Sequence, residues 1–196
     1  MSLHRAVLAG ESVCPTNAIL MVMKLIMKRL LLWAMVCLFS LSLSFAAEDW
    51  GPAQFLIGHW TGDGTGQPGQ GTGSFSFTPD LQGKVVVRKG FAAYPAANGK
   101  PAVRHEDLMI VYRDENSRQL RAMYFDSENH VIAYSVKPAD GGGVVFVTEG
   151  PSDTMRYRLT YSSTGAGRLK LKFEIAPPGK DFATYLEGTA HRDPAN

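Results

Sequence analysis

The most constraining feature of this sequence is a period-two alternation of apolar and polar residues after residue 50. In the run Met155 to Tyr161, apolar residues alternate with Arg and Thr, and residues 169–175 repeat the pattern with Lys and Glu. Such alternation gives a strand one dry face and one wet face. No stretch after Asp49 keeps helical periodicity over three turns. The sequence therefore predicts an all-β fold.

Eight further runs have the same character, at residues 59–64, 73–78, 84–94, 103–113, 119–126, 130–137, 143–149 and 182–191. Short clusters of Gly, Pro, Asn and Asp separate them, as in hairpin turns. About ten strands in one open layer would leave two exposed edges, so the sheet either closes or splits into a sandwich. The even spacing favours a single closed antiparallel up-and-down barrel, lipocalin-like in form. Residues 52–57 look helical and could plug one end.

The N-terminal region has the features of an export signal. Basic residues at 24, 28 and 29 precede an uncharged run from Leu30 to Phe45, and small residues then favour cleavage between Ala46 and Ala47. The run is shorter than the roughly 20 residues that span a bilayer. We expect residues 1–46 to be a signal peptide and residues 47–196 to be a periplasmic or secreted barrel with no membrane span.

Two alternatives stand beside cleavage: a membrane-anchoring helix, and a lipid anchor at Cys37. Met23 and Met27 each begin a conventional leader, so residues 1–22 could reflect a misassigned start.

Removal of the leader changes the charge balance. Residues 1–46 hold four Lys and Arg but only one acid, so residues 47–196 hold 16 basic against 17 acidic residues. Nothing in this balance favours nucleic acid or an anionic membrane as a partner. Both cysteines, Cys14 and Cys37, also leave with the leader. A disulfide, a thiol nucleophile and a thiolate metal site are thereby excluded from the mature chain, which must rely on its hydrophobic core.

The stretch from Leu56 to Gly64 resembles the G-x-W-x-G-x-G opening of the nitrobindin-like, lipocalin-related ten-stranded barrels. Residues 105–109, 124–127 and 173–179 are similar to exported bacterial proteins of unknown function in the same calycin-like group. The resemblance covers nearly the whole mature chain. It implies that Trp60 plugs the barrel floor, with ligand contact as the alternative.

The same resemblance raises the question of haem. Nitrobindins hold haem through a histidine on the last strand, and their pattern placed on residues 185–192 puts Tyr185 at the ligand position. Tyrosinate can ligate ferric haem, but a neutral tyrosine must first be activated. The sequence is compatible both with a haem-binding barrel and with simple packing of Tyr185.

The densest titratable cluster is His105-Glu106-Asp107. On a strand His105 and Asp107 share one face, and Glu106 lies on the other. Either His105 faces the interior as an acid, a base or a hydrogen-bond donor, or Glu106 does. The apolar residues Leu108, Ile110 and Tyr112 continue the face of Glu106, which predicts that Glu106 points inward and needs a partner for its carboxylate.

Other catalytic and metal signatures are weak. The mature histidines lie far apart with no His-x-His pair, and no G-x-S-x-G motif occurs. The run Gly62 to Gly66 matches a phosphate-binding loop only in composition. We therefore assign no metal site and no catalytic residue.

Aromatic residues on several predicted strands would line an apolar, tyrosine-tipped cavity if they turn inward: Phe125, Tyr134, Phe146, Tyr157, Tyr161, Phe173 and Tyr185. Such walls suit a small hydrophobic or amphipathic molecule. The sequence thus favours a binding barrel without its own chemistry. The alternatives are an enzyme using a carboxylate or His105, a haem-binding barrel, and a structural envelope protein. The candidate ligand-binding residues are Trp60, His105, Glu106, Tyr157 and Tyr185.

Overall fold

The computed structural model describes residues 20–29, 49–64, 71–97 and 99–194. The chain divides into two compact units, Met1–Ala46 and Ala47–Asn196. Residues 20–29 of the first unit are helical. Within the described residues, no helix has the length and apolar character needed to cross a membrane. The apolar run 30–45, the expected cleavage site and both cysteines lie outside the described residues.

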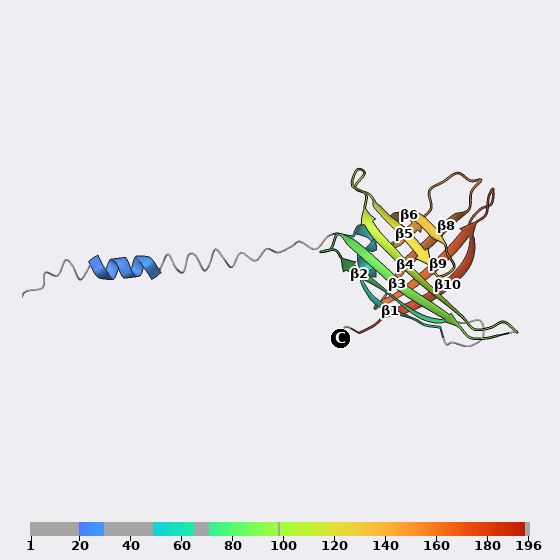
Figure 1. Ribbon diagram of the computed structural model, residues 1–196, viewed down its shortest axis with the longest axis horizontal. Coiled ribbons are helices and arrows are strands. Elements are labelled where there is room, and N and C mark those ends of the chain that lie inside the picture. Colours follow the sequence, from blue (N-terminus) through green and yellow to red (C-terminus); the bar gives the residue numbers. More distant parts are fainter. Residues whose placement is uncertain (1–19, 30–48, 65–70, 98, 195–196) are drawn as a thin grey trace, which may run out of the picture. The chain divides into compact units, whose positions relative to one another are not determined.

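The second unit is a closed antiparallel barrel in which each strand pairs with its neighbours in sequence (Figure 1). Pairing of β1 with both β2 and β10 closes it, through Trp60 opposite Phe75 and Thr61 opposite His191. This confirms the predicted all-β, up-and-down architecture. The ten strands are β1 (Gly58–Gly62), β2 (Thr72–Asp80), β3 (Val85–Tyr94), β4 (Val103–Arg113), β5 (Leu120–Asp126), β6 (Val131–Pro138), β7 (Val144–Val147), β8 (Arg156–Gly165), β9 (Arg168–Ala176) and β10 (Ala183–Arg192).

A short 3-10 helix, η1 (Gly51–Leu56), seals one end of the barrel. Pro52 fits its first turn, where a backbone N–H has no partner to lose. Leu56 is fully buried, and its carbonyl oxygen accepts a hydrogen bond of 2.8 Å from the Trp60 indole N–H. The prediction that this segment plugs the barrel is confirmed, as is the core position of Trp60.

Arg192 fastens the last strand to this plug. Its guanidinium lies 4.4 Å from the centroid of the Trp60 ring and donates to the carbonyl oxygens of Phe55 and Ile57, at 2.7 and 2.6 Å. Gly58 has a φ of +135°, and a side chain there would collide with the Arg192 guanidinium. Glycine at this position therefore allows the seal to form.

The interior beside the plug is filled by aromatic rings. Phe75, Phe77 and Phe146 each lie within about 6 Å, centroid to centroid, of the Tyr161 ring. Edge-to-face geometry dominates, as is common in aromatic cores. This aromatic layer is almost inaccessible to solvent, so it forms the floor of the barrel interior on the side of the plug.

Candidate functional site

At the end of the barrel opposite η1, which we call the open end, the inward-facing side chains are less buried than those beside the plug. There β8 begins, β9 ends and β10 begins, and the side chains that continue the inward faces of these strands are partly exposed. Tyr157 stacks on Phe173 with ring centroids 6.1 Å apart and planes within 2°. Leu186, which is paired with Phe173, is 40% exposed. Inward-facing apolar surface at this end is therefore available to a ligand.

Tyr185 lies on the rim of this opening. A β-bulge between Thr184 and Leu186 displaces it, and its ring meets the edge of Phe173 at 6.1 Å. Its side chain is 74% exposed. Tyr157 and Tyr185, both predicted as ligand contacts, thus lie together at the open end.

A buried ion pair lies between the aromatic floor and the open end. Arg88 of β3 pairs with Asp107 of β4, and both side chains are almost completely buried. The Arg88 Nε–H donates to the Tyr161 hydroxyl at 3.2 Å, and the guanidinium lies 5.1 Å from the centroid of Phe75. A buried charge is stable only when it is paired, so Arg88 and Asp107 each require the other.

Two tyrosines from the next strands extend this polar layer. The rings of Tyr124 on β5 and Tyr134 on β6 lie 6.4 Å apart, centroid to centroid. Burial raises the pKa of both phenols well above its ordinary value, and the Arg88 charge offsets only part of that rise. Both hydroxyls therefore keep their protons and can donate hydrogen bonds.

His105 connects this layer to the rim. Its Nε2 lies 3.1 Å from the Tyr124 hydroxyl, and its Nδ1 lies 3.2 Å from Glu128 Oε1 on the turn between β5 and β6. A neutral ring with the proton on Nδ1 would donate to Glu128 and accept from Tyr124. The imidazole is thus held between an exposed carboxylate and an inward phenol.

The prediction for Glu106 is wrong. His105 and Asp107 share the inward face of β4 with the buried Met109, whereas Glu106 points outward, with a side chain 61% exposed and Arg104 Nε 2.8 Å away. The error arises because β4 has apolar residues on both faces, so its alternation does not say which face is inside. Glu106 therefore does not belong to the interior site.

A second buried carboxylate, besides Asp107, is that of Asp126 at the end of β5. Asp126 lies opposite Asp107 in the pairing of β4 with β5, and its carboxylate Oδ2 lies 2.8 Å from His130 Nδ1. Burial alone would raise the pKa of Asp126. Hydrogen bonds from the backbone and side chain of His130 outweigh burial and lower the pKa. Asp126 therefore keeps its negative charge beside the open end.

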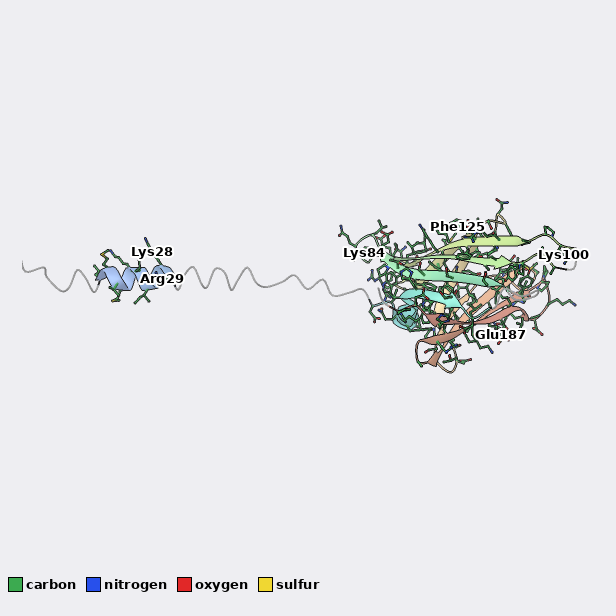
Figure 2. The ribbon with its side chains drawn as sticks, turned by 90° about the horizontal axis from the view of Figure 1, so that it is seen from below. Lys28, Arg29, Lys84, Lys100, Phe125 and Glu187 are labelled. Atoms are coloured by element: carbon green, nitrogen blue, oxygen red, sulfur yellow. The ribbon has the colours of Figure 1, made fainter. Side chains whose placement is uncertain are left out.

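The predicted inward orientation is found for Tyr134, Phe146, Tyr157, Tyr161 and Phe173 but is wrong for Phe125. That side chain is exposed on the outer face of β5, and Figure 2 shows it on the opposite side of the barrel from Glu187. With Phe91 and Leu108 it lines a groove of about 580 Å³ on the outer surface. The lining of this groove also includes Lys89, Arg104 and Glu106, and it reaches Asp107 and Asp126 of the polar layer.

Haem does not fit the residues around Tyr185. A tyrosinate ligand needs a neighbouring base or cation, yet within the described part of the chain the Tyr185 hydroxyl has no hydrogen-bond partner. His191 is directed elsewhere, with its Nδ1 2.7 Å from Asp63 Oδ1. Among the described residues no three His, Cys, Asp or Glu side chains lie close enough to hold a metal ion.

No family model and no curated protein matches the chain. The ten-stranded closed barrel is consistent with a calycin-like fold. The narrower nitrobindin-like resemblance stays a prediction.

Sequence reasoning missed Arg88 and the role of Tyr124. Arg88 could have been noticed as a charge in the strand run Val85-Val86-Val87-Arg88, where a buried partner would be required. That partner, Asp107, lies on the neighbouring strand, and only the register of β3 with β4 brings the two together.

Proposed function

We propose that this protein is an exported barrel that binds a small, largely apolar or amphipathic molecule through its open end. The observation that carries the proposal is the contrast in exposure along the inward faces. Phe77, Phe146 and Tyr161 near the plug are buried, whereas Tyr157 and Phe173 at the open end remain partly exposed. Exposed aromatic surface inside a concave site is a common basis for small-molecule binding.

Complete burial of a large apolar side chain contributes about 1.5–3 kcal/mol relative to full exposure. Tyr157, Phe173 and Leu186 have each realised only part of that contribution, since water still reaches them. A ligand that covers these three side chains would supply the remainder, and the fixed strands require little reordering.

A fluorescence titration with N-phenyl-1-naphthylamine, a neutral apolar probe, tests this function. The full chain would be produced with its leader and purified from the periplasm. We expect bright, saturable binding that Phe173→Ala weakens about tenfold, because one aromatic contact is lost. Phe125→Ala, an equal truncation on the outer face, should leave the affinity unchanged.

Two results would contradict the proposal. Absence of saturable binding would favour a structural role in the envelope. Loss of binding in Phe125→Ala alone would place the ligand in the outer groove. Sequencing the N-terminus of the same material tests export separately, with Ala47 expected as the first residue.

A second candidate function, acid–base chemistry, is favoured by one observation. Glu128, His105 and Tyr124 form a continuous chain of hydrogen-bonding groups from the rim to the interior. Such a chain can orient an imidazole and move a proton. Activity against a panel of p-nitrophenyl esters that rises with pH and is lost in His105→Asn would support this function. Equal rates in wild type and His105→Asn would reject it for these substrates.

A further inference from the structure

A row of side chains crosses the outer face of the barrel and changes from polar to apolar along its length. In the order of strand pairing it runs from Ser76 on β2 through Lys89 on β3 and Leu108 on β4 to Phe125 on β5. All four line the outer groove of about 580 Å³. We propose that this groove binds a single-chain carboxylate, with its head group between Lys89 and Ser76 and its alkyl chain along the apolar part of the row. The groove is separate from the barrel interior, so its ligand need not be that of the open end.

Lys89 supplies a positive charge that no protein group neutralises. Its side chain is exposed, and within the described part of the chain it has no ion-pair partner. The Ser76 hydroxyl, directly opposite on β2, likewise has no hydrogen-bond partner among those residues. Cβ atoms of directly opposite residues lie about 4.5–5.5 Å apart, so the ammonium and the hydroxyl can donate to the two oxygens of one carboxylate. Hydrogen bonds to an ionised acceptor are roughly twice as strong as neutral ones.

The other charges of the groove are paired or lie away from this ammonium group. Arg104 Nε lies 2.8 Å from Glu106 Oε1, and the guanidinium stands 4.0 Å from the centroid of the Phe91 ring. Asp193 Oδ1 accepts a hydrogen bond of 2.8 Å from the Thr61 hydroxyl on β1, two strands from β3. The two inward carboxylates that the groove reaches are paired inside the barrel. Because acidic neighbours repel a doubly charged phosphate more than a singly charged carboxylate, they favour the carboxylate as the head group.

The apolar part of the row can cover an alkyl chain. Phe125 is 39% exposed, and Val131, its partner on β6, is 62% exposed, so water meets apolar surface at this end of the row. Neighbouring strands lie about 4.8 Å apart, and three such steps from Lys89 to Val131 make a strip about 14 Å long. A free cation at one end of an apolar strip matches an anionic amphiphile of medium chain length.

Isothermal titration calorimetry with decanoate, below its micelle-forming concentration and near neutral pH, tests this site on the full chain purified from the periplasm. We expect saturable binding that Lys89→Met weakens at least about tenfold, because a charge-assisted hydrogen bond is lost while the apolar stem is kept. Ser76→Ala should weaken binding about fivefold. Lys170→Met makes the same change of charge on β9, where Lys170 is paired with Glu187, and as the matched control should leave the affinity unchanged.

Two further ligands test the chain and the sign of the head group. Butanoate should bind at least about tenfold more weakly than decanoate, because it covers less apolar surface. Decylammonium should also bind at least about tenfold more weakly, and this difference should largely disappear in Lys89→Met. N-phenyl-1-naphthylamine, the neutral probe of the open end, should bind wild type and Lys89→Met equally.

Three results would overturn the groove site: no saturable binding of decanoate, equal affinity in wild type and Lys89→Met, or an equal loss in Lys170→Met. Decanoate binding that is weakened by Phe173→Ala but not by Lys89→Met would place the carboxylate in the open end, so the interior function would stand without the groove site. Cosedimentation with phosphatidylglycerol vesicles that is lost in Lys89→Met, without binding of free decanoate, would make this face a membrane-contact surface instead.

Discussion

The two ends of this barrel are built from the same strands but are stabilised by different forces. At the η1 end, Leu56 and Trp60 are buried against aromatic rings, and the main polar contacts join Arg192 to backbone carbonyl oxygens. At the open end, the buried pair Arg88–Asp107 and the His105–Tyr124 contact lie among partly exposed aromatics. In Figure 2, Lys84 and Lys100, which flank β3, mark these opposite ends. Apolar packing dominates the sealed end, and the buried polar contacts are concentrated towards the open end.

The largest effect is expected from breaking the buried ion pair. Asp107→Ala would leave the Arg88 guanidinium buried without its carboxylate, and we expect a loss of about 4 kcal/mol in the free energy of unfolding. Replacing both partners by apolar residues, Arg88→Met with Asp107→Leu, should recover most of that loss. Urea denaturation measures both.

The two variants distinguish a structural role of the ion pair from a role in binding. If the double replacement is as stable as the wild type, the ion pair is not needed for the fold, and the presence of its charges near the open end would point to a role in the proposed binding function. An Asp107→Ala variant that matches the wild type in stability would show that the carboxylate is not buried against Arg88 in solution.

Matched leucines test the packing difference directly. Leu56→Ala at the sealed end removes a fully buried side chain and should lower the free energy of unfolding by about 3 kcal/mol. Leu186→Ala at the open end removes one that is 40% exposed, and its effect should be about 1 kcal/mol. Binding of N-phenyl-1-naphthylamine should instead be weakened more by Leu186→Ala than by Leu56→Ala. Equal stability losses would contradict the division of the barrel into a packed end and an open end.

The sequence predicted the packed end better than the open end, for a physical reason. The alternation in β8 and β9 and the Gly-x-Trp opening are local patterns, so strand identity, closure and the positions of Trp60 and the η1 plug could be predicted. The orientation of β4 could not, because Leu108 and Ile110 make its outer face nearly as apolar as its inner face. Pairs such as Arg88 with Asp107, or His105 with Tyr124, join neighbouring strands through their register. A one-residue change in register would have reversed every such assignment.

A further prediction concerns the outer wall of the open end, where β8 and β9 are joined by a charge cluster. Arg158 donates to both carboxylate oxygens of the buried Glu174, at 2.6 and 2.9 Å, and Lys172 Nζ lies 2.8 Å from Oε1. The Arg158 hydrogen bonds, opposed by burial and aided by Lys172, lower the pKa of Glu174 to about 2. Because the folded-state pKa lies below the unfolded-state value, the cluster stabilises the fold at neutral pH, and this contribution declines as the pH falls from about 4.5 towards 2.

Glu174→Gln should therefore be less stable than the wild type by on the order of 2 kcal/mol at neutral pH, a value reduced by the partial exposure of Arg158. The difference should nearly vanish near pH 2, because the wild-type carboxylate is then largely protonated. Glu187→Gln on β10 removes a more exposed partner of Lys170 and should show a much smaller difference at every pH. Urea denaturation of the three proteins across this range is the measurement. A constant difference between wild type and Glu174→Gln would mean that charge does not hold this wall, and the contrast with the sealed end would then rest on the interior pair alone.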